Sequence, residues 1–397
     1  MLSVFLANTV KSTLSDGGKM ITNILRFIFK SVKRLICLVI IFALIITVVA
    51  IKCSRKSSDS EGSVKASVTK NIDDIPIANG YEAPSGREES SEAPSDSSVA
   101  PDKTDTGDNS DPEYITDPYT PTDHAKLTKE VKQLCERYPD ALTLDTIGES
   151  AEDRELYMMK LGKGKKEVLF VAGIHGTEYI ACAFIMRMTE EYAKAYEAGT
   201  PFGPYDVRKL LDETTIYIVP MANPDGVERV QHEGLDWRAN ANGVNLNLNF
   251  PTDKWEDMDR GVYGPDRADY KGDGPASEPE TKAIVKLCDQ HDFDFALSFH
   301  TKGQVLYWID NNTGEVDGAR ELTDKIADYT GYKKMRSTSR VNDYGGGLEN
   351  WFRYKYKRPG ICVEMTPSNG VKGPHNDADF DRLVWDKAKY IGLVVID

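Results

Sequence analysis

Apolar residues are unevenly distributed along the chain, and their pattern divides it into three parts. Residues 35–51 are apolar apart from Thr47 and are flanked by basic residues. Residues 52–118 are mostly polar, with isolated apolar positions and no sustained period. From residue 119 to residue 397, apolar runs of strand length alternate with segments of helical period. The pattern therefore predicts a membrane span, a linker without a core, and one folded domain.

Strands that alternate with helices over this length predict an α/β domain. We expect a mixed, mostly parallel β-sheet between helix layers, with a ligand site outside the carboxyl ends of its strands. The expected strands are near residues 141–147, 156–161, 167–172, 214–220, 293–299, 305–309 and 360–364. The expected helices are near residues 123–137, 177–197, 278–291, 317–330 and 347–355, with a closing helix from about residue 381.

The stretch from residue 167 to residue 180 carries the first candidate chemistry. Its apolar run predicts a buried strand, Gly173 and Gly176 allow a tight exit, and a helix is expected to begin there. On a helical turn His175 and Glu178 share one face and suit zinc, which needs a third protein ligand. Taken alone, the pair is also compatible with a capped turn whose two side chains are solvated.

Two further strand ends carry side chains of the same kind. His300 ends the apolar strand at 293–299, and Glu364 ends the strand at 360–364. A single such residue at a strand end is usually a satisfied surface residue. Three strand ends with metal-binding or acid/base side chains point instead to a shared site.

These residues, with several motifs in the same order, resemble the zinc metallocarboxypeptidase family of the carboxypeptidase A and T type. The resemblance covers about residues 119–397. It includes the His175-x-x-Glu178 pair and the motifs at 223–226 (NPDG), 237–238 (WR), 243–247 (GVNLN) and 277–280 (SEPE), followed by His300 and Glu364.

The resemblance implies one zinc ion per domain, held by His175, Glu178 and His300. It also implies that Glu364 is the general base, that Arg238 polarises the scissile carbonyl, and that Asn247 helps to position the substrate. The family uses a mobile tyrosine over the site, for which Tyr344 beside a triple glycine is the nearest candidate.

One departure bears on the substrate. Exopeptidases of this family carry an arginine after the motif asparagine, and Leu248 stands there. Leucine cannot make the bidentate bond that recognises a free carboxylate. The motifs instead look like the branch that cleaves γ-D-glutamyl-meso-diaminopimelate bonds, where Lys302, Arg340 or Asp343 could contact the substrate's charged groups. For each of these three the alternative is a solvated loop charge.

Charge and cysteine content narrow the function classes. The net charge of −14 gives no support to nucleic-acid binding, which usually needs a basic face. The six cysteines form no C-x-x-C pair, which predicts buried free thiols rather than a disulfide framework.

The basic residues before the apolar run predict the topology of the N-terminal part. Residues 1–34 are expected to be cytoplasmic, 35–51 to be an uncleaved single-pass anchor in the cell membrane, and 52–118 to be a disordered acidic linker. A cleavable signal peptide is the alternative. Both interpretations place residues 119–397 outside the cytoplasm.

Three functions follow as hypotheses. The leading one is a membrane-tethered zinc peptidase that hydrolyses bacterial peptidoglycan stem peptides, with no nucleic-acid partner. The alternatives are a zinc carboxypeptidase that recognises its substrate through another basic residue, and a catalytically inactive wall-binding homologue.

Overall fold

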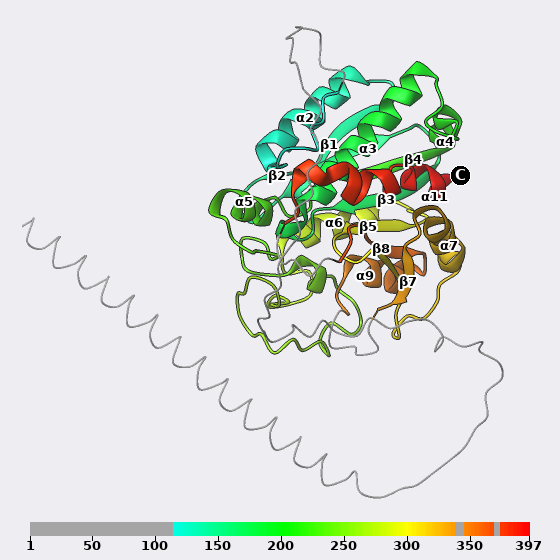
Figure 1. Cartoon of the computed structure of the whole chain (residues 1–397). Helices are drawn as coiled ribbons and strands as arrows, with labels where there is room; N and C mark the ends of the chain where they lie inside the picture. Colours follow the sequence, from blue (N-terminus) through cyan, green and yellow to red (C-terminus); the bar gives the residue numbers. More distant parts are fainter. Residues whose placement is uncertain (1–113, 338–344, 369–373) are drawn as a thin grey trace, which may run out of the picture. The chain divides into compact units, whose positions relative to one another are not determined.

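The computed structural model describes residues 114–337, 345–368 and 374–397 (Figure 1). The predicted membrane span at 35–51 and the linker up to residue 113 lie outside these residues. No helix in the described part of the chain is long and apolar enough to cross a bilayer.

The strands and helices follow one another in the α/β order that the sequence predicts. The strands are β1 (Leu142–Glu149), β2 (Glu155–Leu161), β3 (Lys166–Ala172), β4 (Thr214–Val219), β5 (Ala296–His300), β6 (Val305–Ile309), β7 (Lys333–Arg336) and β8 (Gly360–Glu364). The α-helices are α2 (His124–Arg137), α3 (Tyr179–Ala198), α4 (Val207–Glu213), α5 (Pro224–Glu233), α6 (Pro279–Gln290), α7 (Ala319–Thr330), α9 (Leu348–Tyr356), α10 (Asp386–Ala388) and α11 (Ile391–Ile396). Short 3₁₀ turns are η2 (Gly176–Glu178), η3 (Leu246–Leu248) and η4 (Asp377–Asp379), and Asp381–Trp385 forms a π turn, η5.

The strands form one mixed sheet in the order β1-β2-β4-β3-β5-β8-β6-β7. The four central strands β4, β3, β5 and β8 run parallel, and β6 pairs with β7 in parallel. The pairs β1–β2, β2–β4 and β6–β8 are antiparallel. The predicted mixed, mostly parallel sheet is therefore confirmed.

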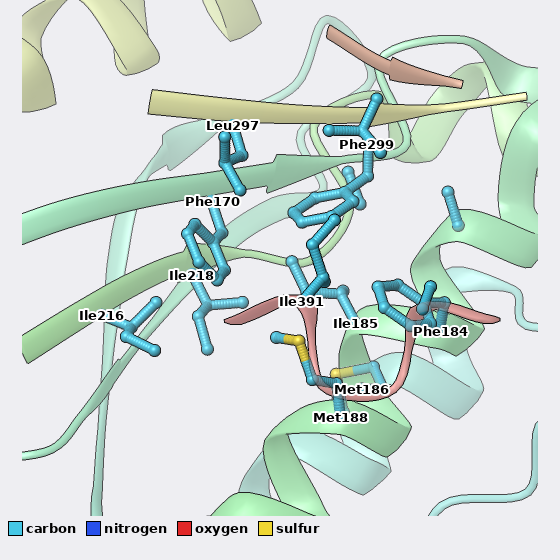
Figure 2. Packing of buried hydrophobic residues seen from close by; sticks show 14 of the residues in the cluster. Phe170, Phe184, Ile185, Met186, Met188, Ile216, Ile218, Leu297, Phe299 and Ile391 are labelled. Atoms are coloured by element: carbon cyan, nitrogen blue, oxygen red, sulfur yellow. The ribbon is translucent and has the colours of Figure 1, made fainter. Parts of the chain in front are cut away.

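Alternating side chains of the central strands pack into two separate cores. On β3, Phe170 packs against one helix layer, whereas Leu169 and Val171 face the other. Figure 2 shows the first layer, where Phe170 and Phe299 meet Phe184 of α3. The helices α3, α4, α7 and α11 cover this face, and α6 and α9 cover the other. Burial on both faces explains why these strands read as continuous apolar runs.

The cysteines of the described domain are free. Cys182, Cys288 and Cys362 are buried and Cys135 is half-buried, as expected for unpaired thiols that pack as small apolar residues.

Candidate active site

Three neighbouring parallel strands bring the candidate residues to one edge of the sheet. β3 and β8 both pair with β5 in parallel, so the carboxyl ends of the three strands lie side by side. His300 and Glu364 are direct register partners at the ends of β5 and β8. The chain leaves β3 through Gly173, whose φ of 66° lies in the left-handed region that favours glycine. His175 therefore turns back towards the same edge.

The local geometry of His175 differs from the sequence prediction. We expected His175 and Glu178 on the same helical turn, but His175 is extended, with φ −105° and ψ 134°, and only Glu178 lies in the 3₁₀ turn η2. Gly176 makes this tight turn possible, because a Cβ there would lie 2.4 Å from the Gly226 carbonyl oxygen. The two side chains nevertheless meet, since the turn folds Glu178 back under His175.

His175, Glu178 and His300 form a buried cluster of metal-binding side chains. His175 Nδ1 lies 3.0 Å from Glu178 Oε1, His300 Nδ1 lies 2.9 Å from Glu178 Oε2, and the two Nδ1 atoms are 3.2 Å apart. Ligands of tetrahedral zinc at about 2.0–2.1 Å are separated from one another by roughly 3.3–3.4 Å. The cluster is thus slightly tighter than a zinc site, and its three ligand atoms converge on one point.

Hydrogen bonds on the far side of each imidazole orient the two histidines for metal binding. Asn245 Nδ2 donates to the Ala268 carbonyl, so Asn245 Oδ1 must face His175 Nε2, at 3.1 Å. Because that oxygen only accepts, His175 carries its proton on Nε2 and keeps Nδ1 as the ligand atom. His300 Nε2 lies 2.6 Å from Ser298 Oγ, and this contact orients the ring so that its Nδ1 faces the cluster. Partners of this kind are typical of zinc-binding histidines.

The charge states also suit a divalent cation. Burial, reinforced by Arg238, lowers the pKa of His175 to about 4, so its imidazole is neutral at pH 7, as a metal ligand must be. His175 and Arg238 hold the pKa of Glu178 well below its usual range against the effect of burial. Glu178 raises the pKa of His300 against the effect of burial. Two imidazoles and one carboxylate are a donor set for zinc, which when bound polarises a carbonyl and lowers the pKa of a coordinated water.

Glu364 lies beside this cluster, and one of its two carboxylate oxygens makes no hydrogen bond within the described residues. Within the described residues its Oε2 is buried and has no hydrogen-bond partner, and its Oε1 is 3.8 Å from Cys362 Sγ. Burial, together with the nearby Glu178, raises the pKa of Glu364 to about 8. A carboxylate with a raised pKa at a reaction centre is suited to accept a proton at neutral pH.

Arg238 reaches the cluster from the loop after α5. Its Nη1 lies 2.8 Å from Glu178 Oε1, and its Nη2 lies 3.0 Å from His175 Nδ1. The Asn223 side chain holds the Arg238 backbone, because its Nδ2 donates to the Arg238 carbonyl at 3.3 Å. The side chain is 38% exposed, so the guanidinium faces both the cluster and solvent.

The structure describes only some of the other predicted substrate-binding residues. Asn247 Oδ1 accepts the Leu348 backbone N–H at 3.1 Å, so it joins the GVNLN motif to the start of α9. Lys302 is half-buried near Glu178 and Arg238. Arg340 and Tyr344, with Asp343, lie outside the described residues. Leu248 is buried against Trp255 and Met258, so its side chain packs in an apolar cluster.

Sequence reasoning missed Asn245 and His375. Asn245 stands in the quoted GVNLN motif, which could have indicated its role. His375 is buried, and its Nε2 lies 2.7 Å from Thr366 Oγ1. It is close enough to Glu178 and Lys302 for their charges to act on it. Only the fold brings it within reach of the site.

Comparison with known proteins agrees with this geometry. The family model for zinc carboxypeptidases, Peptidase_M14, matches residues 127–369. The chain belongs to the zinc carboxypeptidase family. It is therefore classed with the zinc metallopeptidases, and the His-Glu-His cluster fits a zinc site.

Relatives in this family include enzymes of two kinds. The chain is 31% identical over 264 residues to gamma-D-glutamyl-L-diamino acid endopeptidase 1 of Lysinibacillus sphaericus, covering 61% of this chain and 65% of that protein. It is 29% identical over 197 residues to mast cell carboxypeptidase A of Rattus norvegicus, covering 46% of each. The matched part thus spans less than two thirds of either relative.

Solved structures of this family share the fold. A crystal structure of thrombin activatable fibrinolysis inhibitor superposes with a TM-score of 0.59 at 22% identity, covering 70% of this chain and 74% of that chain. Carboxypeptidase A of Helicoverpa armigera gives a TM-score of 0.55 at 17% identity, covering 70% and 75%. At these identities the likeness extends to the fold alone.

Proposed function

We propose that this zinc peptidase hydrolyses the bond between γ-linked D-glutamate and the diamino acid diaminopimelate within bacterial cell-wall stem peptides. The observation that carries the chemistry is a Glu364 oxygen beside the His175–Glu178–His300 cluster that is buried and has no hydrogen-bond partner within the described residues. The choice of bond rests on the similarity to the gamma-D-glutamyl-L-diamino acid endopeptidase of Lysinibacillus sphaericus.

Glu364 transfers the proton in this reaction, and Arg238 stabilises the developing negative charge. Glu364 accepts a proton from the attacking water at its uncommitted oxygen and returns it to the leaving amine. Arg238, whose guanidinium reaches the edge of the cluster, donates hydrogen bonds to the oxygen of the scissile carbonyl as negative charge develops there. Asn247, in η3 and bonded to the first residue of α9, helps to position the substrate.

The environment of Leu248 favours an endopeptidase over a carboxypeptidase. Its side chain is 1% exposed and packs with Trp255 and Met258, so this position offers no cation to a terminal carboxylate. The carboxypeptidase alternative retains support from the similarity to mast cell carboxypeptidase A. It would need another basic residue to hold the free carboxylate.

We further propose that residues 35–51 anchor the chain in the cell membrane, with residues 1–34 cytoplasmic and the peptidase domain outside. The apolar run and its basic flank support this topology. Residues 52–113 would then act as a tether that lets the domain reach the wall.

Substitution of Glu364 by glutamine tests the chemistry. We expect kcat on a wall pentapeptide, L-Ala-γ-D-Glu-diaminopimelate-D-Ala-D-Ala, to fall by about 10²- to 10⁴-fold, the usual contribution of general base catalysis. Zinc content, measured on the same samples, should stay at one ion per chain. Equal activity of the two proteins would refute the role of Glu364, and a wild type that binds zinc but cleaves no peptide would favour the inactive wall-binding alternative.

A further inference from the structure

A second cluster of metal-binding side chains lies where the start of α2 meets the end of α5. It consists of Asp123, which precedes α2, and of Glu228 and His232, which lie one helical turn apart on α5. His232 Nε2 lies 3.3 Å from Asp123 Oδ2 and 3.2 Å from Glu228 Oε2, and the three ligand atoms all lie within 4.8 Å of one another. The cluster shares no residue with the zinc cluster at the sheet edge, so it is a separate candidate.

Backbone groups fix both carboxylates so that one oxygen of each faces His232. Asp123 Oδ1 accepts the Lys126 N–H at 2.8 Å as the N-cap of α2, which leaves Oδ2 to face the imidazole. Glu228 Oε1 accepts the His124 N–H at 3.0 Å, which leaves Oε2 to face the same ring. Carboxylates that bind metals are commonly held in place by hydrogen bonds of this kind. The two free oxygens are therefore positioned before any ion binds.

No basic side chain of the described domain balances the charge of this cluster by a salt bridge. Among the described residues, His232 is the only group within ion-pair distance of Asp123 or Glu228. Two like charges that face one point repel each other, and a divalent cation between them would replace this repulsion by attraction. The imidazole is 57% exposed, whereas the two carboxylates are 24% and 21% exposed. An ion can thus enter from solvent, and water can complete its coordination.

The donor atoms and their spacing indicate the class of ion. Residues four apart on a helix project from the same face, so Glu228 and His232 can bind one ion from α5 while Asp123 supplies the third ligand. The separations of 3.2 and 3.3 Å are close to the roughly 3.3–3.4 Å between ligand atoms of tetrahedral zinc. An imidazole nitrogen favours zinc and its neighbouring transition metals, whereas calcium and magnesium prefer oxygen ligands alone. The cluster therefore suits a divalent transition metal.

We infer that Asp123, Glu228 and His232 bind a second zinc ion, which fastens the end of α5 to the start of α2. The other end of α5 supports the active site, because its N-cap residue Asn223 donates to the Arg238 carbonyl at 3.3 Å. The second ion thus holds in place the helix on which the Arg238 backbone rests. This inference does not depend on which peptide bond the enzyme cuts.

The zinc content of the full-length protein tests the inference. In equilibrium dialysis at free zinc concentrations raised beyond saturation of the first site, we expect the wild type to take up a second ion per chain. His232→Gln should keep the first ion and weaken binding of the second by at least about 100-fold, since losing even a partner behind a ligand costs about 10- to 100-fold. Glu228→Gln, whose side-chain oxygen can still accept the His124 N–H, should have the same effect.

His291→Gln is the matched control. His291 also pairs with a carboxylate, with Nδ1 3.2 Å from Glu167 Oε2, but no second carboxylate of the described domain joins this pair to form a metal-binding group. The control should therefore bind the second ion as the wild type does. Thermal unfolding gives an independent readout. At a free zinc concentration about 100-fold above the dissociation constant of the second site, the zinc-dependent rise in midpoint should be larger in the wild type than in His232→Gln by about 5 °C or more.

Three results would overturn the inference. A wild type that stays at one ion per chain would show that the cluster is only an ion pair between His232 and the two carboxylates. A second ion that both variants retain with wild-type affinity would lie elsewhere in the protein. Calcium that displaces the second zinc ion at equal concentration would show a site for oxygen-binding cations instead. Each of these results would leave the peptidase function standing, whereas a protein with both ions that cleaves no wall peptide would refute that function alone.

Discussion

Asn245 is the residue on which the orientation of His175 depends. Its amide is fixed by two backbone groups, since Nδ2 donates to the Ala268 carbonyl and Oδ1 accepts the Asn247 N–H at 3.0 Å. The same Oδ1 then accepts the Nε2 proton of His175. A neutral amide therefore performs the task that a carboxylate often performs behind a zinc-binding histidine.

Substitution of Asn245 by alanine should weaken zinc binding by about 10- to 100-fold, the usual cost of losing a partner behind a metal ligand. Asn245→Asp keeps the acceptor oxygen and should stay within a few-fold of the wild type. Competition with a chromophoric chelator measures both affinities. Wild-type affinity in Asn245→Ala would show that packing alone orients His175.

At the scale of single residues, the sequence predicted the metal-binding side chains but not the buried residues around them. His175, Glu178 and His300 stand out because their side chains have zinc-binding chemistry and occur at the edges of apolar runs. Glu349 gives no such signal, because a glutamate in the first turn of a helix is ordinary in sequence and its burial arises only when α9 packs on the sheet. The roles of Arg340 and Tyr344 stay predictions.

Among the secondary-structure elements, the period of the apolar residues and the length of the apolar runs predicted most strands of the central sheet. The strand expected at 167–172 is β3, and the strand expected at 360–364 is β8. The helix α5, which follows the Asn223 motif, was not predicted, because Pro224 and Gly226 lower its apparent helix propensity. The structure shows Asn223 capping it, with Oδ1 accepting the Gly226 N–H at 2.9 Å.

The helix α2 carries a buried carboxyl group that should make stability depend on pH. Burial raises the pKa of Glu130 to about 7, from an ordinary value of 4.5. Between these two values the folded state binds more protons than the unfolded state, so this group's contribution to stability is lost as pH rises from about 4.5 to 7. The full effect is at most about 3 kcal/mol.

Glu130→Gln should remove this contribution, because glutamine stays neutral and its oxygen can still accept the Asp117 N–H. The free energy of unfolding, measured by urea denaturation at pH 5 and pH 8, should therefore fall less with pH in Glu130→Gln than in the wild type. The comparison between the two proteins cancels the effect of other carboxyl groups. Identical pH dependence would contradict the burial argument.

At the scale of the whole molecule, the folded domain includes residues that the sequence assigns to the linker. The Glu190 carboxyl group is fully buried on α3 and accepts the N–H groups of Ile115 and Thr116 at 2.6 and 2.8 Å. It also accepts the Thr116 hydroxyl at 2.6 Å. The polar composition of this segment did not predict the contact with Glu190, because the contact is made by backbone groups and a hydroxyl rather than by apolar side chains.

A chain that starts at residue 119 should accordingly be less stable than one that starts at residue 114. Removal of residues 114–118 leaves the buried Glu190 carboxyl group without these three donors, which typically costs about 3 kcal/mol. Urea unfolding of the two truncated proteins measures the difference. Equal midpoints would show that Glu190 finds other partners or reaches solvent.

We propose that the zinc site cuts between γ-linked glutamate and the diamino acid. Mass spectrometry of the products from L-Ala-γ-D-Glu-diaminopimelate-D-Ala-D-Ala tests it most directly, with Glu364→Gln as the control. The expected products are L-Ala-D-Glu and diaminopimelate-D-Ala-D-Ala, both absent with Glu364→Gln. Release of single D-alanine residues from the carboxyl end would contradict it and identify a carboxypeptidase instead.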